Sequence, residues 1–168
     1  VLINFAMSLT SEGERVLLVD SNLRNPSLHH VFNLGKENGF AELILGKVTL
    51  KDVIKETLFD NRFEITCGMD HFSPSSVFKS NSLGIHIEEM KTQADWIIFD
   101  APQINSYDDP ITLASKVDGV VMVVEAEKTR WEVAQRAKQR IENGNGKILG
   151  VVLNKRQLHI PDWLYKRL

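Results

Sequence analysis

The sequence predicts an α/β fold in which a doubly wound, mostly parallel sheet carries helices on both faces. Two observations support this fold class. Near-continuous apolar runs rich in β-branched residues are typical of strands buried on both faces, and amphipathic helical patterns alternate with them. Such runs predict strands at 16–19, 96–99, 120–124 and 148–153, with a weaker candidate at 63–67. Strands that alternate with helices in this way form parallel sheets.

Helices are expected between these strands. Apolar residues at i, i+3, i+4, i+7 spacing predict a first helix from Leu2 to Leu9 that ends at Gly13. The same spacing recurs at 83–90 and 134–141. Shorter helices are predicted at 40–45, 50–58 and 109–116, whereas 68–82, with Pro74 and several serines, is predicted to be a loop.

Size and composition narrow the function classes. A chain of 168 residues fits one domain and can bury a sizeable core. The formal net charge of -2 argues against a general nucleic-acid binder, which would present a basic face. The single cysteine, Cys67, excludes an internal disulfide and fits a reducing cytoplasm. No apolar run approaches the length of a membrane span, so a single cytoplasmic domain over 1–168 is expected.

Polar residues follow the four apolar runs, namely Asp20, Asp100, Glu125 and Asn154. In open α/β sheets, ligands bind beyond the carboxyl ends of the strands. Two carboxylates at one such edge are suited to hold Mg²⁺ beside a phosphate, or to accept a proton from a nucleophile. For any one of these positions, a polar residue where a strand meets water is the ordinary alternative. Asp20 and Asp100 together, with Arg24 four residues after the first, favour a site.

The first helical pattern is already running at Val1, without a capping residue or a polar first turn. A sheet of this kind also usually has a strand before its first helix. We therefore expect a strand and a turn upstream of Val1, which residues 1–168 would lack.

The run 16–26, Val-Leu-Leu-Val-Asp-Ser-Asn-Leu-Arg-Asn-Pro, resembles the second Walker A segment (Walker A′) of the bacterial tyrosine autokinases. These proteins act in capsule and exopolysaccharide export and form a branch of the P-loop ATPases that also holds MinD and ParA. Segment 95–102 resembles the Walker B motif of the family, and 28–32, 39–43, 118–129 and 150–154 resemble its other characteristic stretches. The motifs follow in the family's order and cover essentially the whole chain.

The resemblance implies an ATP-binding, tyrosine-kinase-like domain that regulates capsule or exopolysaccharide synthesis or export. It makes Asp20 the Walker A′ acid, near Mg²⁺ and the attacking hydroxyl, and Asp100 the Walker B acid that holds Mg²⁺ through water. Arg24 would support the A′ loop. Asn154 would contact the adenine, since an amide matches the donor and acceptor of a base edge. Arg156 would flank the base.

The resemblance also implies partners and a location. The family works with a membrane-anchored polysaccharide co-polymerase that activates the kinase, so the domain would lie at the inner face of the membrane and associate with its own copies. The family's phosphate-binding Walker A loop, with its Lys and Ser/Thr, would end just before Val1.

Three positions depart from the family pattern. Asn22 stands where the family has a second A′ aspartate, and an uncharged amide binds metal less well. Pro102-Gln103 replaces a double proline. The family's C-terminal tyrosine cluster is reduced to Tyr165, which is better interpreted as a packing residue. These departures keep a second hypothesis open, a scaffolding subunit of the same system that binds ATP without efficient catalysis.

Two other classes are disfavoured. A MinD- or ParA-type positioning ATPase shares the fold, but the continuation Arg24-Asn25-Pro26 resembles the autokinase branch. A phosphorelay receiver would carry an acidic pair after its first strand, where this chain has Asp20-Ser21.

The histidines and the cysteine are expected to be structural. Adjacent His29 and His30 diverge, and no third metal ligand is apparent near them, so they are expected to be surface or packing residues. Cys67 follows an apolar strand and is expected to be a buried thiol.

Overall fold

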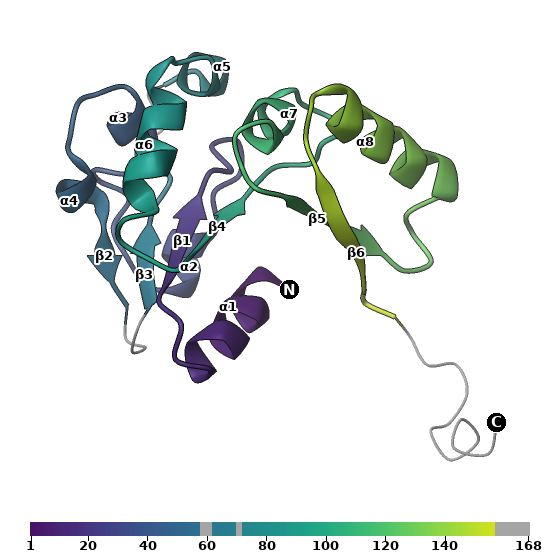
Figure 1. The fold of residues 1–168 in the computed structure, drawn as a ribbon, viewed down its shortest axis with the longest axis horizontal. Coiled ribbons are helices and arrows are strands. Elements are labelled where there is room, and N and C mark those ends of the chain that lie inside the picture. Colours follow the sequence, from purple (N-terminus) through teal and green to yellow (C-terminus); the bar gives the residue numbers. More distant parts are fainter. Residues whose placement is uncertain (58–61, 70–71, 157–168) are drawn as a thin grey trace.

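The computed structural model describes residues 1–57, 62–69 and 72–156 (Figure 1). Helices and strands alternate through most of the chain. Their order is α1 (Leu2–Ser11), β1 (Val16–Asp20), α2 (Leu28–Val31), α3 (Phe40–Ile44), α4 (Leu50–Val53), β2 (Lys55–Glu56), β3 (Arg62–Ile65), α5 (Pro74–Phe78), α6 (Ser82–Met90), β4 (Trp96–Asp100), α7 (Asp109–Ala114), β5 (Val120–Glu125), α8 (Trp131–Asn143) and β6 (Ile148–Asn154). Within the described ranges, no helix is both long and apolar enough to cross a bilayer.

The strands form two sheets. β1 lies between β3 and β4 and is parallel to both, while the short β2 pairs antiparallel with β3, giving the order β2-β3-β1-β4. β5 and β6 form a separate parallel pair. The expected mostly parallel α/β architecture is therefore confirmed. In the described part of the chain, however, the sheet is divided between β4 and β5, so each of these strands keeps one unpaired edge.

Helices cover both faces of the larger sheet. Leu17 and Val19 of β1 point into a core built with α3, α4, α5 and α6. Val16 and Leu18 point to the opposite face and pack against Ala6 of α1 and Leu28 of α2. Figure 1 shows α1 on one side of this sheet and α3 and α6 on the other. This alternation explains why β1, covered on both faces, is an unbroken apolar run.

The β5–β6 pair is covered on one face only. α8 packs against this pair with Ala137 and Ile141 buried, and Figure 1 shows α8 along one side of it. On the other face, five apolar side chains are 50–62% exposed: Val121, Val123, Leu149, Val151 and Leu153. The prediction that 120–124 and 148–153 are buried on both faces is therefore wrong for the described residues. It is also wrong for 96–99, where Trp96 is 45% exposed and the next three residues are only partly buried. A near-continuous apolar run in the sequence cannot reveal whether a second layer of the protein is present to cover the strand.

Two predicted element boundaries need correction. The helix expected at 50–58 ends at Val53, because Ile54 adopts an extended conformation (ψ 120°) and leads into β2; residues 58–61 lie outside the described ranges. The loop expected at 68–82 contains α5, where Pro74 occupies the first helical turn and Val77 and Phe78 are buried. Proline has no N–H to lose there, so it favours a helix start rather than a loop. The single-turn helix α2 and the two-residue β2 were not expected from the sequence.

The two glycines Gly39 and Gly84 should respond oppositely to alanine. A Cβ on Gly39 would overlap the backbone of Gly68 and the carbonyl oxygen of Thr66, whereas a Cβ on Gly84 in α6 would meet open space. We expect Gly39→Ala to lower the free energy of unfolding by about 1–3 kcal/mol. Gly84→Ala should raise it by about 0.5–1 kcal/mol, because alanine favours the helix. Urea unfolding at an unchanged m-value measures both, and equal effects of the two substitutions would contradict the close approach at Gly39.

Candidate nucleotide and metal site

The two acids predicted from the sequence lie side by side. Asp20 and Asp100 end the neighbouring parallel strands β1 and β4 and are register partners. The pairing of the two strands continues one residue beyond them, because the backbone N–H of Ser21 donates a hydrogen bond to the carbonyl oxygen of Asp100 at 3.1 Å. Asp20 is fully buried and Asp100 is half-buried. The expectation that both acids meet at one edge of the sheet is met by this geometry.

The Asp20 carboxylate is held by backbone donors. Its Oδ2 accepts hydrogen bonds from the N–H groups of Ser27 and Leu28, both at 3.0 Å, and its Oδ1 accepts one from Asn22 at 3.3 Å. Leu28 is the first residue of α2, so two of the donors belong to the start of that helix. The carboxylate therefore folds the segment after β1 back toward the strand and is itself fixed in orientation.

Burial disfavours the ionised form of both acids. Burial raises the pKa of Asp20, and the hydrogen bonds from Leu28, Ser27 and Asn22 only partly oppose this. Burial and the neighbouring charge of Asp20 raise the pKa of Asp100 to about 6. Two adjacent carboxylates with raised pKa values gain from a cation between them, because it offsets both the lost hydration and their mutual repulsion. Their oxygens are the ligands that Mg²⁺ prefers.

Arg24 binds protein rather than standing free. Its Nε donates to Oδ2 of Asp109 at 2.8 Å, and its guanidinium lies 4.1 Å from the ring centroid of Tyr107. Asp109 is buried and begins α7. Arg24 thus joins the loop after β1 to α7, and its role in supporting the A′ loop stays a prediction. Beside this pair lies an open cavity of about 280 Å³, also lined by Phe78 and Lys79.

Asn22 shapes the same loop. Its Oδ1 accepts a hydrogen bond from the backbone N–H of Asn25 at 3.2 Å, which is a side-chain-stabilised turn. A carboxylate would make the same bond, so the loop conformation does not depend on the amide. What the amide changes is the charge beside Asp20.

Asn154 and Arg156 lie at the far sheet. Asn154 ends β6 opposite Glu125, and its carbonyl oxygen accepts a hydrogen bond from Ala126 N–H at 2.9 Å. Arg156 is exposed. No hydrogen bond or ion pair within the described residues joins either of them to Asp20 or Asp100, so their contact with adenine stays a prediction. Tyr165 lies outside the described residues.

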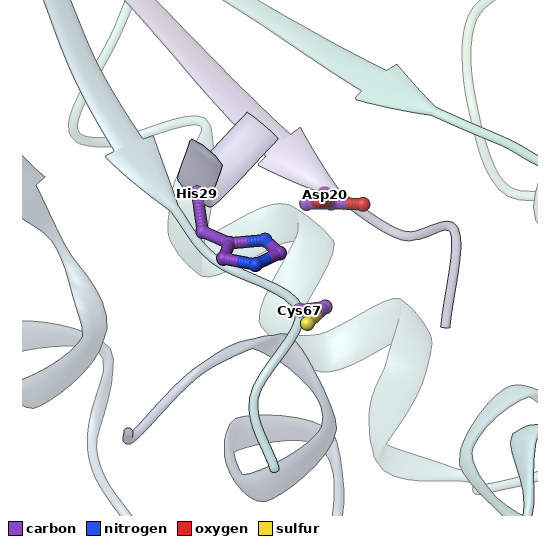
Figure 2. A group of neighbouring side chains, drawn as sticks. All are labelled: Asp20, His29 and Cys67. Atoms are coloured by element: carbon purple, nitrogen blue, oxygen red, sulfur yellow. The ribbon is translucent and has the colours of Figure 1, made fainter. Parts of the chain in front are cut away.

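Asp20 belongs to a cluster of three buried side chains that could hold a metal ion. Asp20, His29 and Cys67 each offer one ligand atom, and these atoms lie within 4.8 Å of one another (Figure 2). Cys67 is buried, as expected. His29 is 6% exposed and is therefore a packing residue rather than a surface one. The expectation that His29 and His30 diverge is wrong, because their ring centroids lie 3.8 Å apart. The expectation that no third ligand lies near them is also wrong. The sequence could not show this, because the fold brings the three residues together from separate segments.

Sequence reasoning also missed Glu64 on β3. Its side chain is fully buried, and within the described ranges neither carboxylate oxygen has a hydrogen-bond partner. Burial and the charge of Asp20 raise the pKa of Glu64 to about 8, against a smaller opposing effect of Lys55. The one available signal was a charged residue within the apolar run 63–67.

The chain resembles known proteins in sequence. No family model matches it. It is 34% identical over 152 residues to the putative tyrosine-protein kinase CapB of Staphylococcus aureus, which covers 90% of this chain and 67% of CapB. It is 30% identical over 153 residues to the tyrosine-protein kinase CpsD of Streptococcus agalactiae, with 90% and 67% covered. The chain thus spans about two thirds of the length of these relatives.

Solved structures resemble it as well. The chimeric protein CapA2B2 superposes with a TM-score of 0.87 at 28% identity, over 94% of this chain and 70% of that one. The kinase domain of VpsO gives 0.85 at 27% identity, over 93% and 77%. MinD of Pyrococcus horikoshii, solved with Mg-ADP, superposes with a TM-score of 0.71 over 98% of this chain and 68% of that one. At 20% identity, this likeness shows the fold alone.

The fold of the chain is that of the P-loop NTPases. Within that class, the sequence relatives are more specific. The chain belongs to the bacterial tyrosine-kinase family that includes CapB and CpsD.

The buried Glu64 should make stability pH-dependent. Its pKa is about 8 when folded against an ordinary 4.5, so between these values the folded state holds a proton that the unfolded state releases. The free energy of unfolding should therefore fall as pH rises through this window, by up to about 1.4 kcal/mol per pH unit. Glu64→Gln should remove that slope and be more stable than the parent protein at pH 8.

Chemical denaturation at several pH values measures this slope. Glu12→Gln, on the exposed end of α1, is the control and should leave the slope unchanged. An unaltered slope in Glu64→Gln would mean that Glu64 is ionised in the folded protein.

Proposed function

We propose that this protein is an ATP-binding, tyrosine-kinase-like domain that regulates the synthesis or export of capsule or exopolysaccharide. The observation that carries the proposal is the register pairing of Asp20 and Asp100 at the carboxyl ends of adjacent parallel strands. Membership of a family whose relatives are named tyrosine-protein kinases supplies the reaction class. The polysaccharide setting comes from the motif resemblance.

The acids fit Mg²⁺. Each is withdrawn from water and has a raised pKa, so a divalent cation stabilises the pair. Bound there, Mg²⁺ would neutralise charge on the phosphates of ATP. Three backbone donors fix Asp20 and leave about one lone-pair direction of its carboxylate open. If Asp100 holds Mg²⁺, the open lone-pair direction of Asp20 is left to take the proton of a tyrosine hydroxyl, and its raised pKa suits it to that role.

Other residues complete the proposed nucleotide site. Arg24, tied to Asp109, keeps the A′ loop in place. Asn154 and Arg156 are assigned to the adenine by resemblance. The unpaired edges of β4 and β5 are suited to accept a parallel strand between them, which would join the two sheets and carry the Walker A loop. That strand and loop are part of the proposal.

The proposal extends to partners. A membrane-anchored polysaccharide co-polymerase would activate the domain at the inner face of the membrane, and copies of the domain would associate. These points rest on the resemblance, since the chain spans about two thirds of the relatives it matches.

Asp100→Asn tests the site in protein that includes the proposed phosphate loop. We expect the parent protein to bind ATP in a Mg²⁺-dependent way and Asp100→Asn to lose phosphoryl transfer by about 100-fold or more, because the metal loses an anionic ligand. Asp118→Asn, whose side chain is 92% exposed, is the matched control and should behave as the parent. Calorimetry and a phosphotyrosine assay measure the two effects. Absence of Mg²⁺-dependent ATP binding in the parent protein would refute the proposal.

Asn22 favours a second candidate, an ATP-binding scaffold with weak catalysis. Because the amide already makes the turn with Asn25, Asn22→Asp should keep the loop and add a charge beside Asp20. We expect this substitution to raise the phosphoryl-transfer rate by about 10-fold or more, since one more anionic ligand strengthens Mg²⁺ binding. Asn25→Asp on the same loop is the control. If the parent protein forms no phosphotyrosine with ATP and activator, and Asn22→Asp restores it, the scaffold is the better description.

A further inference from the structure

We propose that Asp20, His29 and Cys67 form a buried binding site for a thiophilic divalent metal ion of the zinc type. This site is separate in chemistry from the Mg²⁺ site proposed above, and it stands whether or not the protein is a kinase.

The three ligands come from three segments. Asp20 ends β1, His29 lies in α2, and Cys67 follows β3 by two residues. One potential ligand atom from each lies within 4.8 Å of the other two. Figure 2 shows the imidazole of His29 extending toward the space between the carboxylate and the sulfur. Atoms this close can share one ion after small side-chain adjustments, since bonds to zinc are about 2.0–2.3 Å long.

The donor set selects the metal. A sulfur, an imidazole nitrogen and a carboxylate oxygen are the ligands found in tetrahedral zinc sites. Mg²⁺ and Ca²⁺ instead require shells of oxygen, which Cys67 and His29 cannot provide. The Asp20–Asp100 pair has the opposite preference, because it offers oxygen alone. Asp20 belongs to both candidate sites. The remaining ligands, Asp100 in one site and His29 with Cys67 in the other, would therefore decide which class of metal ion binds.

The ligands are positioned without a metal. Asp20 is fixed by three backbone donors, two of which come from Ser27 and Leu28 next to His29. The Sγ of Cys67 lies 3.1 Å from the carbonyl oxygen of Gly68. Exposures of 0% for Asp20, 6% for His29 and 2% for Cys67 keep water away from the cluster. Ligand side chains that are already fixed in place favour metal binding, because they lose little conformational entropy when the ion binds.

Glu64 supplies an independent observation. It is fully buried on β3, the strand that leads to Cys67, and it interacts electrostatically with Asp20. Within the described ranges its two oxygens accept no hydrogen bond. A second buried carboxylate beside Asp20 is unfavourable unless positive charge lies near it, and the charge of Lys55 offsets this only in part. A divalent ion at the cluster would supply further positive charge near both carboxylates.

Co²⁺ is the probe for this site, because thiolate-bound cobalt gives a sulfur-to-metal charge-transfer band and tetrahedral cobalt gives intense visible bands. The reduced protein is titrated with Co²⁺, and Zn²⁺ is then added to displace it. The test variants are Cys67→Ser and His29→Gln. His86→Gln on α6 and Asp118→Asn, whose side chain is 92% exposed, lie outside the cluster and are the matched controls, while Asp100→Asn tests whether the neighbouring acid takes part in binding.

We expect one Co²⁺ per chain with a thiolate band that Zn²⁺ abolishes. Cys67→Ser should remove the band. Both test variants should weaken Zn²⁺ binding by at least about 10–100-fold, which is the loss typical of mutating residues that only contact the metal ligands. The controls should match the parent protein. Zn²⁺ should raise the Tm of the parent protein but not that of Cys67→Ser, and circular dichroism without metal establishes that the variants fold.

Three results would overturn the proposal. The parent protein could show no thiolate band at saturating Co²⁺. Cys67→Ser and His29→Gln could bind Zn²⁺ as tightly as the parent, which would assign the metal to the acids alone. Asp100→Asn could abolish binding, which would merge this site with the proposed Mg²⁺ site. If one test variant does not fold, the other decides. Mg²⁺-dependent ATP binding is measured in its own assay, so the proposed function can fail while the zinc-type site stands, and the reverse.

Discussion

The buried carboxylate of Asp20 is the constraint on which the site depends. A charge withdrawn from water is costly unless donors surround it, and three backbone N–H groups from the following segment meet that need. In doing so they turn the chain back after β1, start α2 and place His29 beside the strand end. The same turn carries Arg24 to Asp109. One side chain therefore determines the path of the whole segment after β1.

Negative charge is concentrated at this edge of the sheet. Asp20, Asp100 and Glu64 are all withdrawn from water, and the charge of Asp20 raises the pKa of the other two. Sheet geometry causes this, because parallel register places the last residues of β1 and β4 side by side. Such a cluster is stable only with protons or cations bound. Both the proposed function and the proposed zinc-type site are ways of meeting that single electrostatic requirement.

Local patterns in the sequence revealed the strands and the acids that follow them. The run ending at Asp20 is apolar because β1 is enclosed on both faces, whereas β4 is only partly buried. In both strands the polar residue after the run indicated the edge of the sheet. Contacts between distant segments were not visible in this way. Nothing local brings Cys67 to His29, and nothing local shows that Val121 and Leu153 lie on an uncovered face. In α5, proline was interpreted as a loop signal although it also begins helices.

The short helix α7 has a mechanical consequence for the molecule. At its start, Asp109 is paired with Arg24 from the loop after β1, while the preceding Asp108 pairs with Arg140 of α8 at 2.5 Å. The start of α7 is thus connected by one ion pair to the loop after β1 and by another to α8, which packs on the second sheet. The Asp108 side chain is 91% exposed and that of Asp109 only 7%. Rising ionic strength should accordingly weaken the exposed Asp108–Arg140 ion pair before the buried Arg24–Asp109 pair, leaving the α8 junction to the bonds from Arg140 to the carbonyl oxygens of Ile104 and Tyr107.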